Sequence, residues 1–225
     1  IVPIAVLNTC LFISVNYHLL ENTIFTVDQI GRSSFTIPYI DGGVSISRSA
    51  RTYPTYLLFK PGMVITALLL IKFWLTNNKF FNKINSVNGK NYFLIFGIGS
   101  ALFLILHSIF LGINIENDYY KFFRRFVLLG FIIFEVIAQA LLVLTIVKVK
   151  DKIKSFINRK MLVLKIILVS ILIIVAILTA PLLNSTDYTL FKHALEWNYF
   201  LGVVTFYLIT YFFWRKTPVH TPEGA

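Results

Sequence analysis

Long apolar blocks, separated by short loops rich in lysine and arginine, are the feature of this sequence that most constrains its fold. Six blocks reach or approach the roughly 20 residues that a helix needs to cross a hydrocarbon core about 30 Å thick. They cover residues 1–20, 57–75, 92–113, 126–149, 161–183 and 198–214. Because a bilayer offers no water to unpaired backbone groups, we predict an all-α, polytopic bundle of about six transmembrane helices.

The overall composition supports a membrane protein and argues against a soluble one. Charged residues make up 14% of the 225-residue chain and hydrophobic residues 57%, whereas soluble domains carry about 25% charged residues. The net charge of +11 comes mostly from the short loops, so we expect no nucleic-acid partner. Cys10 is the only cysteine, which excludes an intrachain disulfide and a cysteine-rich metal site. We predict no metal and no cofactor.

The charges of the loops indicate an orientation. The loops at 77–91 and 148–160 are strongly basic, and the tail begins with Arg215 and Lys216, whereas the alternate loops are mixed in sign. Because basic residues collect on the cytoplasmic side, we predict that both termini are cytoplasmic. Residues 1–216 then form one bundle, residues 217–225 a cytoplasmic tail, and residues 21–56 a long extracytoplasmic first loop. The choice between an endomembrane and the plasma membrane stays open. The first block lacks the basic n-region and cleavage site of a signal peptide, so we expect a retained helix.

The first loop and the start of the last block share an ordered set of aromatic, proline and polar residues. In chain order they are Pro38-Tyr39-Ile40, Ile46-Ser47, Tyr53-Pro54 and Glu196-Trp197. This order resembles the Frag/DRAM/Sfk family, which includes FGF-receptor-activating-like proteins, damage-regulated autophagy modulators and suppressor-of-four-kinase-like proteins. Its members have about six spans, an outward first loop with a Pro-Tyr-Ile-Ser type of motif, and an acidic–aromatic pair that opens the last helix.

The resemblance implies a role linked to membrane lipids: GPI-anchor lipid remodelling, support of a phosphoinositide kinase, or autophagy-type regulation. Several positions depart from the family pattern: Asp41 replaces a usual Ser, Arg48 a common acid and Ala50 an expected Gly, and Pro54 stands alone where two prolines are usual. A His that is often found just after the third helix is missing as well. The family implies no catalytic set, so no role is assigned to its signature residues. We call these the loop signature: Pro38, Tyr39, Ile46, Ser47, Tyr53, Pro54, Glu196 and Trp197.

Glu135, near the middle of block 126–149, is the most informative single residue. A carboxylate at the bilayer centre costs at least about 2.5 kcal/mol, so we expect it to face the bundle or a wet cavity. Gln139 lies four residues later and shares its helix face, and His107 in block 92–113 is expected within about 5 Å of the same depth. We predict an intramembrane polar site of Glu135, Gln139 and His107, which either titrates or binds a ligand, or else joins helices by hydrogen bonds.

Several other polar residues have two interpretations or a structural one. Lys72 and Lys165 are expected to extend to the cytoplasmic interface along their apolar stems. His193 and Glu196 share a face if the last helix begins early, and they form either a headgroup site or a solvated helix start. Asn184 opens an Asn-Ser-Thr glycosylation sequon, but it lies so close to the end of block 161–183 that we expect it to be unmodified.

Four functions remain open from the sequence. The favoured one is a non-catalytic protein with a lipid-linked or regulatory role and membrane lipids as partners. The others are an accessory subunit bound to other membrane-protein subunits, a proton- or ion-coupled carrier centred on Glu135 and His107, and an intramembrane lipid-modifying enzyme. An enzyme would use outer-face residues such as Ser47 with His18 or His193. The chain contains no Gly-rich phosphate loop, zinc-protease motif or nucleophile-elbow motif.

Overall fold

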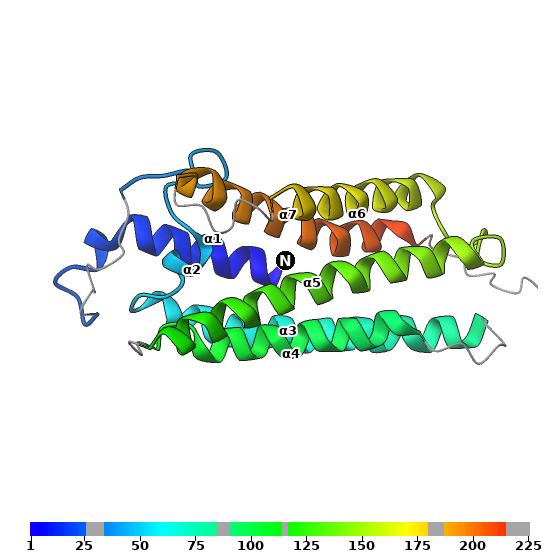
Figure 1. The fold of residues 1–225 in the computed structure, drawn as a ribbon, viewed down its shortest axis with the longest axis horizontal. Helices are drawn as coiled ribbons and strands as arrows, with labels where there is room; N and C mark the ends of the chain where they lie inside the picture. Colours follow the sequence, from blue (N-terminus) through cyan, green and yellow to red (C-terminus); the bar gives the residue numbers. More distant parts are fainter. Residues whose placement is uncertain (26–33, 85–90, 114–116, 180–186, 215–225) are drawn as a thin grey trace, which may run out of the picture.

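The computed structural model describes residues 1–25, 34–84, 91–113, 117–179 and 187–214. Within these ranges the regular elements are all helices, and no β-strand is formed (Figure 1). The elements are α1 (Val2–Val15), the 3₁₀ helix η1 (Tyr17–Leu20), α2 (Ile46–Ser49), α3 (Thr55–Ile84), α4 (Tyr92–Phe110), α5 (Asp118–Val149), α6 (Arg159–Thr179) and α7 (Thr189–Phe213).

Four of these helices, α3 to α6, are long and apolar enough to cross a membrane. Helix α1 is apolar but has 14 residues, fewer than a span needs. Helix α7 has 25 residues, but polar residues such as Glu196 and Asn198 lower its hydropathy, and it is not among the four. The all-α membrane class is therefore supported by four helices, and the count of six spans stays a prediction.

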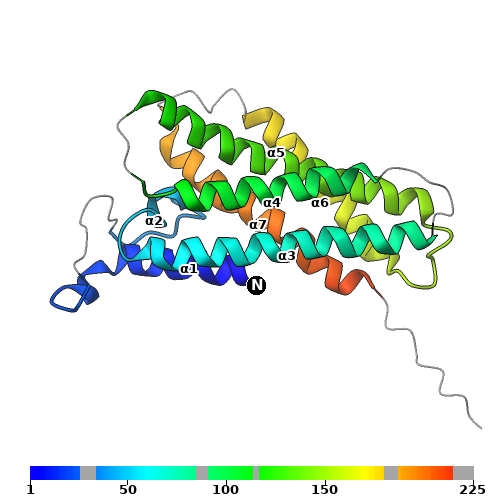
Figure 2. The same ribbon diagram turned by 90° about the horizontal axis from the view of Figure 1, so that it is seen from below.

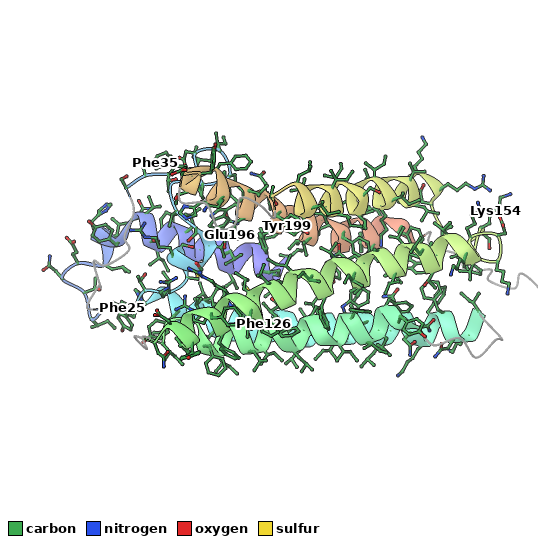
Figure 3. The ribbon with its side chains drawn as sticks, viewed as in Figure 1. Phe25, Phe35, Phe126, Lys154, Glu196 and Tyr199 are labelled. Carbon is green, nitrogen blue, oxygen red and sulfur yellow. The ribbon has the colours of Figure 1, made fainter. Side chains whose placement is uncertain are left out.

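The long helices run side by side along the length of the molecule (Figures 1 and 2). Helix α4 packs against both α3 and α5, α1 lies on α3, and α6 lies on α7. Phe35 and Glu196 lie at one end of the bundle and Lys154 at the other (Figure 3). The first loop and the basic loop around Lys154 thus occupy opposite ends, which is the arrangement that the predicted orientation requires.

Two glycines allow neighbouring helices to approach closely. A Cβ atom at Gly62 of α3 would overlap the side chain of Val6 on α1, and one at Gly97 of α4 would overlap the indole of Trp74 on α3. Trp74 is fully buried, and its ring lies 6.3 Å from that of Tyr207 on α7. The side chain of this tryptophan therefore occupies the space left by the missing side chain of Gly97 on α4. It contacts α4 and α7 from α3, near the middle of the bundle.

Several helix ends differ from those expected from hydropathy. Helix α5 begins at Asp118 rather than near residue 126, and its N-cap Asn117 accepts a hydrogen bond from the Tyr119 amide at 2.9 Å. Helix α7 begins at Thr189 rather than near residue 198, and α3 continues to Ile84 rather than ending near residue 75. Hydropathy marks the apolar stretch of a helix, whereas the backbone can continue as polar helical turns beyond it.

Candidate functional site

Residues 36–50 of the first loop are fastened to the first turns of α7 by side chains that bind the main chain of the loop. The indole Nε1 of Trp197 donates to the carbonyl of Val44 at 2.9 Å, and Nδ2 of Asn198 donates to the carbonyl of Tyr39 at 2.7 Å. The ring of Tyr39 packs edge-on against Trp197, with 5.0 Å between centroids. Its hydroxyl donates to Oδ1 of Asn8 on α1 at 3.0 Å, so the loop is held on two helices.

A sharp turn at Gly42 brings the loop still closer to α7. Gly42 has φ +65°, and a Cβ at this position would overlap the backbone carbonyl of Leu190. The carbonyl of Gly42 lies 2.9 Å from Nδ1 of His193, one turn further along α7. A residue with a side chain would be strained in this left-handed conformation as well as blocked by Leu190. We call this whole arrangement the loop clamp, formed by Tyr39, Gly42, Val44, His193, Glu196, Trp197 and Asn198.

Glu196 contributes to the loop clamp through the short helix α2. The backbone N–H groups of Ile46 and Ser47, in the first turn of α2, hydrogen-bond to its carboxylate. These are orphan donors at a helix start, which an acidic side chain satisfies well. Desolvation nevertheless dominates and raises the pKa of Glu196 to about 7, against the two amide hydrogen bonds.

Asp41 shapes the turn that precedes the loop clamp. Its carboxylate accepts hydrogen bonds from the hydroxyl of Thr36, from the amide of Ile37 at 2.8 Å and from the amide of Gly43 at 2.8 Å. These donors, with the Thr36 hydroxyl the strongest, lower the pKa of Asp41. The carboxylate of Asp41 therefore closes this turn.

The structure brings most of the loop signature together. Tyr39, Ile46, Ser47, Glu196 and Trp197 all take part in the contacts between the loop and α7. The buried Pro38 immediately precedes them. The last pair, Tyr53-Pro54, lies instead at the start of α3, where the Tyr53 ring packs against those of Phe25 and Tyr56.

A second polar group lies inside the bundle around Glu135, which is 1% exposed. The hydroxyl of Ser100 on α4 donates to its Oε2 at 2.7 Å, and Nε2 of Gln139 donates to its Oε1 at 2.9 Å. The hydroxyl of Tyr207 on α7 also donates to Oε1. We call these four residues the buried carboxyl cluster; it joins α4, α5 and α7 through side chains.

His107 lies outside this cluster. It follows Ser100 by seven residues on α4, or about 10 Å along the helix axis, and its ring packs edge-on against Phe59 at 6.4 Å between centroids. The side chains that hydrogen-bond to Glu135 in the described part of the chain are those of Ser100, Gln139 and Tyr207. The predicted depths of Glu135 and His107 were counted from the expected ends of their helices. They were wrong because α5 begins at Asp118, well before the expected start near residue 126.

Lys165 corrects another expectation. Its side chain is fully buried rather than extended to the interface. Its Nζ donates to Oγ1 of Thr210 at 2.6 Å and lies 4.1 Å from the ring centroid of Phe206 and 5.3 Å from that of Phe213. Helix α7 packs directly on α6. Its Thr210 hydroxyl and aromatic rings are therefore nearer to the ammonium group than the membrane interface is. Sequence reasoning missed Tyr207, Thr210 and Ser100 as partners, because such residues are ordinary in membrane helices.

His193 and Ser47, two of the residues considered for an enzyme, have structural partners, as do the neighbouring Ser45 and Ser49. His193 contacts the carbonyl of Gly42, and Ser45 caps α2 by accepting from the Arg48 amide at 3.2 Å. The hydroxyl of Ser49 donates to the carbonyl of Ile46 at 2.9 Å, and that of Ser47 lies 3.4 Å from that of Ser45. Among the described residues, no three His, Cys, Asp or Glu side chains are placed to hold a metal ion. The Asn184 sequon lies outside the described residues.

Comparisons of the chain with protein-family models, with curated proteins and with solved structures gave no match.

Proposed function

We propose that the chain is a six-span integral membrane protein with both termini in the cytoplasm, and that it has a non-catalytic, lipid-linked role. In this proposal α1 and α7 also cross the membrane, so that together with the four apolar helices they make six spans. The first loop forms a fixed cover on the extracytoplasmic end. The observation that carries the proposal is the loop clamp: His193 and Glu196, two polar side chains that an outer-face enzyme could use, are engaged with the main chain of the loop.

Orientation is tested by labelling single cysteines in sealed membranes. Cys10 is buried, so a Cys10→Ala background makes Ser34→Cys and Lys154→Cys the only thiols. Both positions are exposed and lie in loops at the two ends of the bundle. A membrane-impermeant maleimide should label Ser34→Cys in intact cells and Lys154→Cys only after permeabilisation. Labelling of both from the same side would reject the six-span arrangement.

The non-catalytic role is tested with the purified protein in lipid nanodiscs. A photoreactive phospholipid should crosslink to the outer end of the bundle, and Trp197→Ala, which removes both the indole donor and the ring contact with Tyr39, should reduce that crosslinking. Mass spectrometry of the lipids before and after incubation should show no new product. A new acyl or headgroup product that disappears in Glu196→Gln would show an enzyme and overturn the proposal.

A proton- or ion-coupled carrier is the second candidate, and the buried carboxyl cluster favours it. Glu135 and Lys165 are both buried within membrane-spanning helices, and both bind α7, through Tyr207 and Thr210 three residues apart. Buried ionisable residues of this kind commonly mark ion or proton pathways.

The carrier is tested in proteoliposomes that contain a pH-sensitive dye. Glu135→Gln keeps the size of the side chain but removes its titration, and it should abolish any pH-driven flux. Ile133→Leu, at a 52% exposed position on the same helix, is the matched control. Full flux in Glu135→Leu would eliminate this candidate.

A further inference from the structure

The connection between α5 and α6 is a basic turn at the end of the bundle opposite the first loop (Figures 1 and 3). Between residues 148 and 160 the sequence has six basic residues and one acidic residue, Asp151. The basic side chains are all exposed: Lys148, Lys150, Lys152, Lys154, Arg159 and Lys160. Both flanking helices are long and apolar enough to cross a membrane, so in a bilayer this turn lies at a membrane surface, whichever way the chain is inserted.

The turn is folded onto the end of the bundle. The amide of Ile153 donates to the carbonyl of Val149 at 3.3 Å, and the amide of Asn158 donates to the carbonyl of Phe213 at the end of α7 at 2.9 Å. The side chains of Ile153 and Ile157 are buried, each with 1% exposure. These contacts fix the backbone of the turn, so its exposed cations are held on the outer surface of the bundle end.

Phe156 differs from its apolar neighbours in this turn. It is 45% exposed, although Ile153 and Ile157 on either side of it are buried. Its amide donates to the carbonyl of Ile153 at 2.9 Å, which holds its backbone in place. Aromatic rings at a membrane surface insert at the level of the headgroups, so an exposed phenylalanine among cations is suited to contact with a bilayer.

Three of the cations continue helix faces that are apolar and exposed. Each is four residues from an exposed apolar residue of its own helix, on the side toward the helix end. The pairs are Leu144 with Lys148 on α5, and Val163 with Arg159 and Leu164 with Lys160 on α6. Residues four apart share a helix face and differ by about 6 Å along the axis. In a bilayer the apolar members face acyl chains, so the cations lie one turn further out, at the depth of the headgroups.

Two general explanations of basic residues cover only part of this arrangement. Lys148 is in the last turn of α5, where the helix dipole favours a cation, but Arg159 and Lys160 are in the first turn of α6, where it favours an anion. Topogenic charge requires basic residues in the turn. It does not require them to continue lipid-facing helix faces beside an exposed Phe156. An anion bound at this surface would offset both the repulsion between the cations and the unfavourable dipole.

We propose that Arg159 and Lys160, together with Lys148 and Phe156, bind the headgroups of anionic phospholipids in the adjacent leaflet. Charge complementarity favours this occupant, because the cations lie directly beyond lipid-facing positions, at the depth of the lipid phosphates. In the proposed orientation this is the cytoplasmic leaflet, whose anionic lipids attract basic segments beside transmembrane helices. The inference goes beyond the proposed function, because it requires α5 and α6 to cross the bilayer but neither six spans nor a lipid-linked role.

The test measures which lipids lie beside the turn in a reconstituted bilayer. A neutral fluorophore is attached to Ser155→Cys, an exposed position, in the Cys10→Ala background. Nitroxide-labelled phosphatidylserine or phosphatidylcholine, which quenches only at short range, is added at increasing mole fraction to both leaflets of a phosphatidylcholine bilayer. Half-quenching should need several-fold less phosphatidylserine than phosphatidylcholine. Arg159→Gln combined with Lys160→Gln should abolish most of this preference, since each cation at an anionic surface contributes about fivefold.

Lys152→Gln combined with Lys154→Gln is the matched control. It removes the same charge from the same turn, but these residues lie outside both helices and continue no lipid-facing helix face. The control should therefore keep most of the preference, and circular dichroism of each variant verifies that the fold is kept.

Three outcomes would overturn the site. An equal loss in the two double variants would assign the preference to the net charge of the turn. Equal quenching by the two lipids before any charge is removed would show no preference for an anionic headgroup. Absence of quenching by either lipid would place the turn away from the bilayer, as expected if an acidic protein segment covered it. Crosslinking that fails in the nanodisc experiment while this preference persists would reject only the proposed lipid-linked role.

Discussion

The loop clamp and the buried carboxyl cluster both depend on side-chain hydrogen bonds, but in very different settings. In the loop clamp, side chains of α7 bind main-chain groups of a loop at one end of the bundle. In the cluster, side chains bind one carboxyl group between three helices. Water can replace a lost partner of the exposed Asn198 or the partly exposed His193, but not one of the buried Glu135. The cluster should therefore tolerate substitution less well than the clamp.

Glu135→Leu should have the largest effect on stability. It removes the acceptor of the Tyr207 hydroxyl and one hydrogen bond each of Ser100 and Gln139, whose donors keep the carbonyls of Gly97 and Val203. We expect this to cost about 2–3 kcal/mol of the free energy of unfolding. Thermal unfolding in detergent measures the loss. Glu135→Gln keeps an acceptor and is the control, with an expected loss of about 1 kcal/mol or less. Equal stability of Glu135→Leu and wild type would mean that the cluster does not hold the helices together.

Gly42→Ala should release the loop without unfolding the helices. The new Cβ would overlap the carbonyl of Leu190, and a left-handed conformation costs an additional 1–2 kcal/mol or so in a residue with a side chain. Hydrogen exchange should show faster exchange at residues 36–50 and little change in α4 and α5. Phe35→Ala, at an 82% exposed position, is the control. An unchanged exchange rate in Gly42→Ala would contradict the observed contact.

Docking of the first loop should weaken as the pH rises from about 4.5 to about 7. The pKa of Glu196 is about 7 when docked and 4.5 at its ordinary value, so in this range undocking releases a proton and becomes more favourable as the pH increases. Above pH 7 the effect should level off. Exchange at residues 46–50, corrected for the intrinsic pH dependence of amide exchange, measures it.

Two variants make the assignment of this pH dependence specific. Glu196→Gln should abolish it, and His193→Gln serves as a control for the neighbouring imidazole of the loop clamp. A pH dependence that survives in Glu196→Gln would assign the titration to another group.

Lys165→Met should have the smallest effect, within about 0.5 kcal/mol. The substitution removes the hydrogen bond to Thr210 and the contacts with Phe206 and Phe213, but it also removes the cost of desolvating an ammonium group, and the two terms oppose each other. Thermal unfolding of Lys165→Met, measured under the same conditions as that of Glu135→Leu, compares the two losses of stability directly. A loss as large as that of Glu135→Leu would show that the lysine stabilises the contact between α6 and α7 strongly.

Much of the fold could be predicted because hydropathy acts locally. Blocks 92–113 and 161–183 correspond closely to α4 (Tyr92–Phe110) and α6 (Arg159–Thr179). The starts of α5 and α7 were harder to predict, because their first turns are polar and a hydropathy profile detects only the apolar stretch of a helix. Glu135 and Gln139 could be paired by their spacing of four residues. Tyr207 could not, because its partnership depends on how α7 rotates against α5.

The sequence by itself predicted a helical membrane protein, because long apolar blocks leave no other way to satisfy backbone groups in lipid, and the structure has four helices long and apolar enough to cross a membrane. The sequence also identified the residues of the loop signature, but it did not predict which residues they contact. Only the tertiary structure decided that Trp197 and Asn198 hold the loop and that Lys165 turns into the bundle. These outcomes depend on the positions of helices far apart in the chain, which local spacing does not specify.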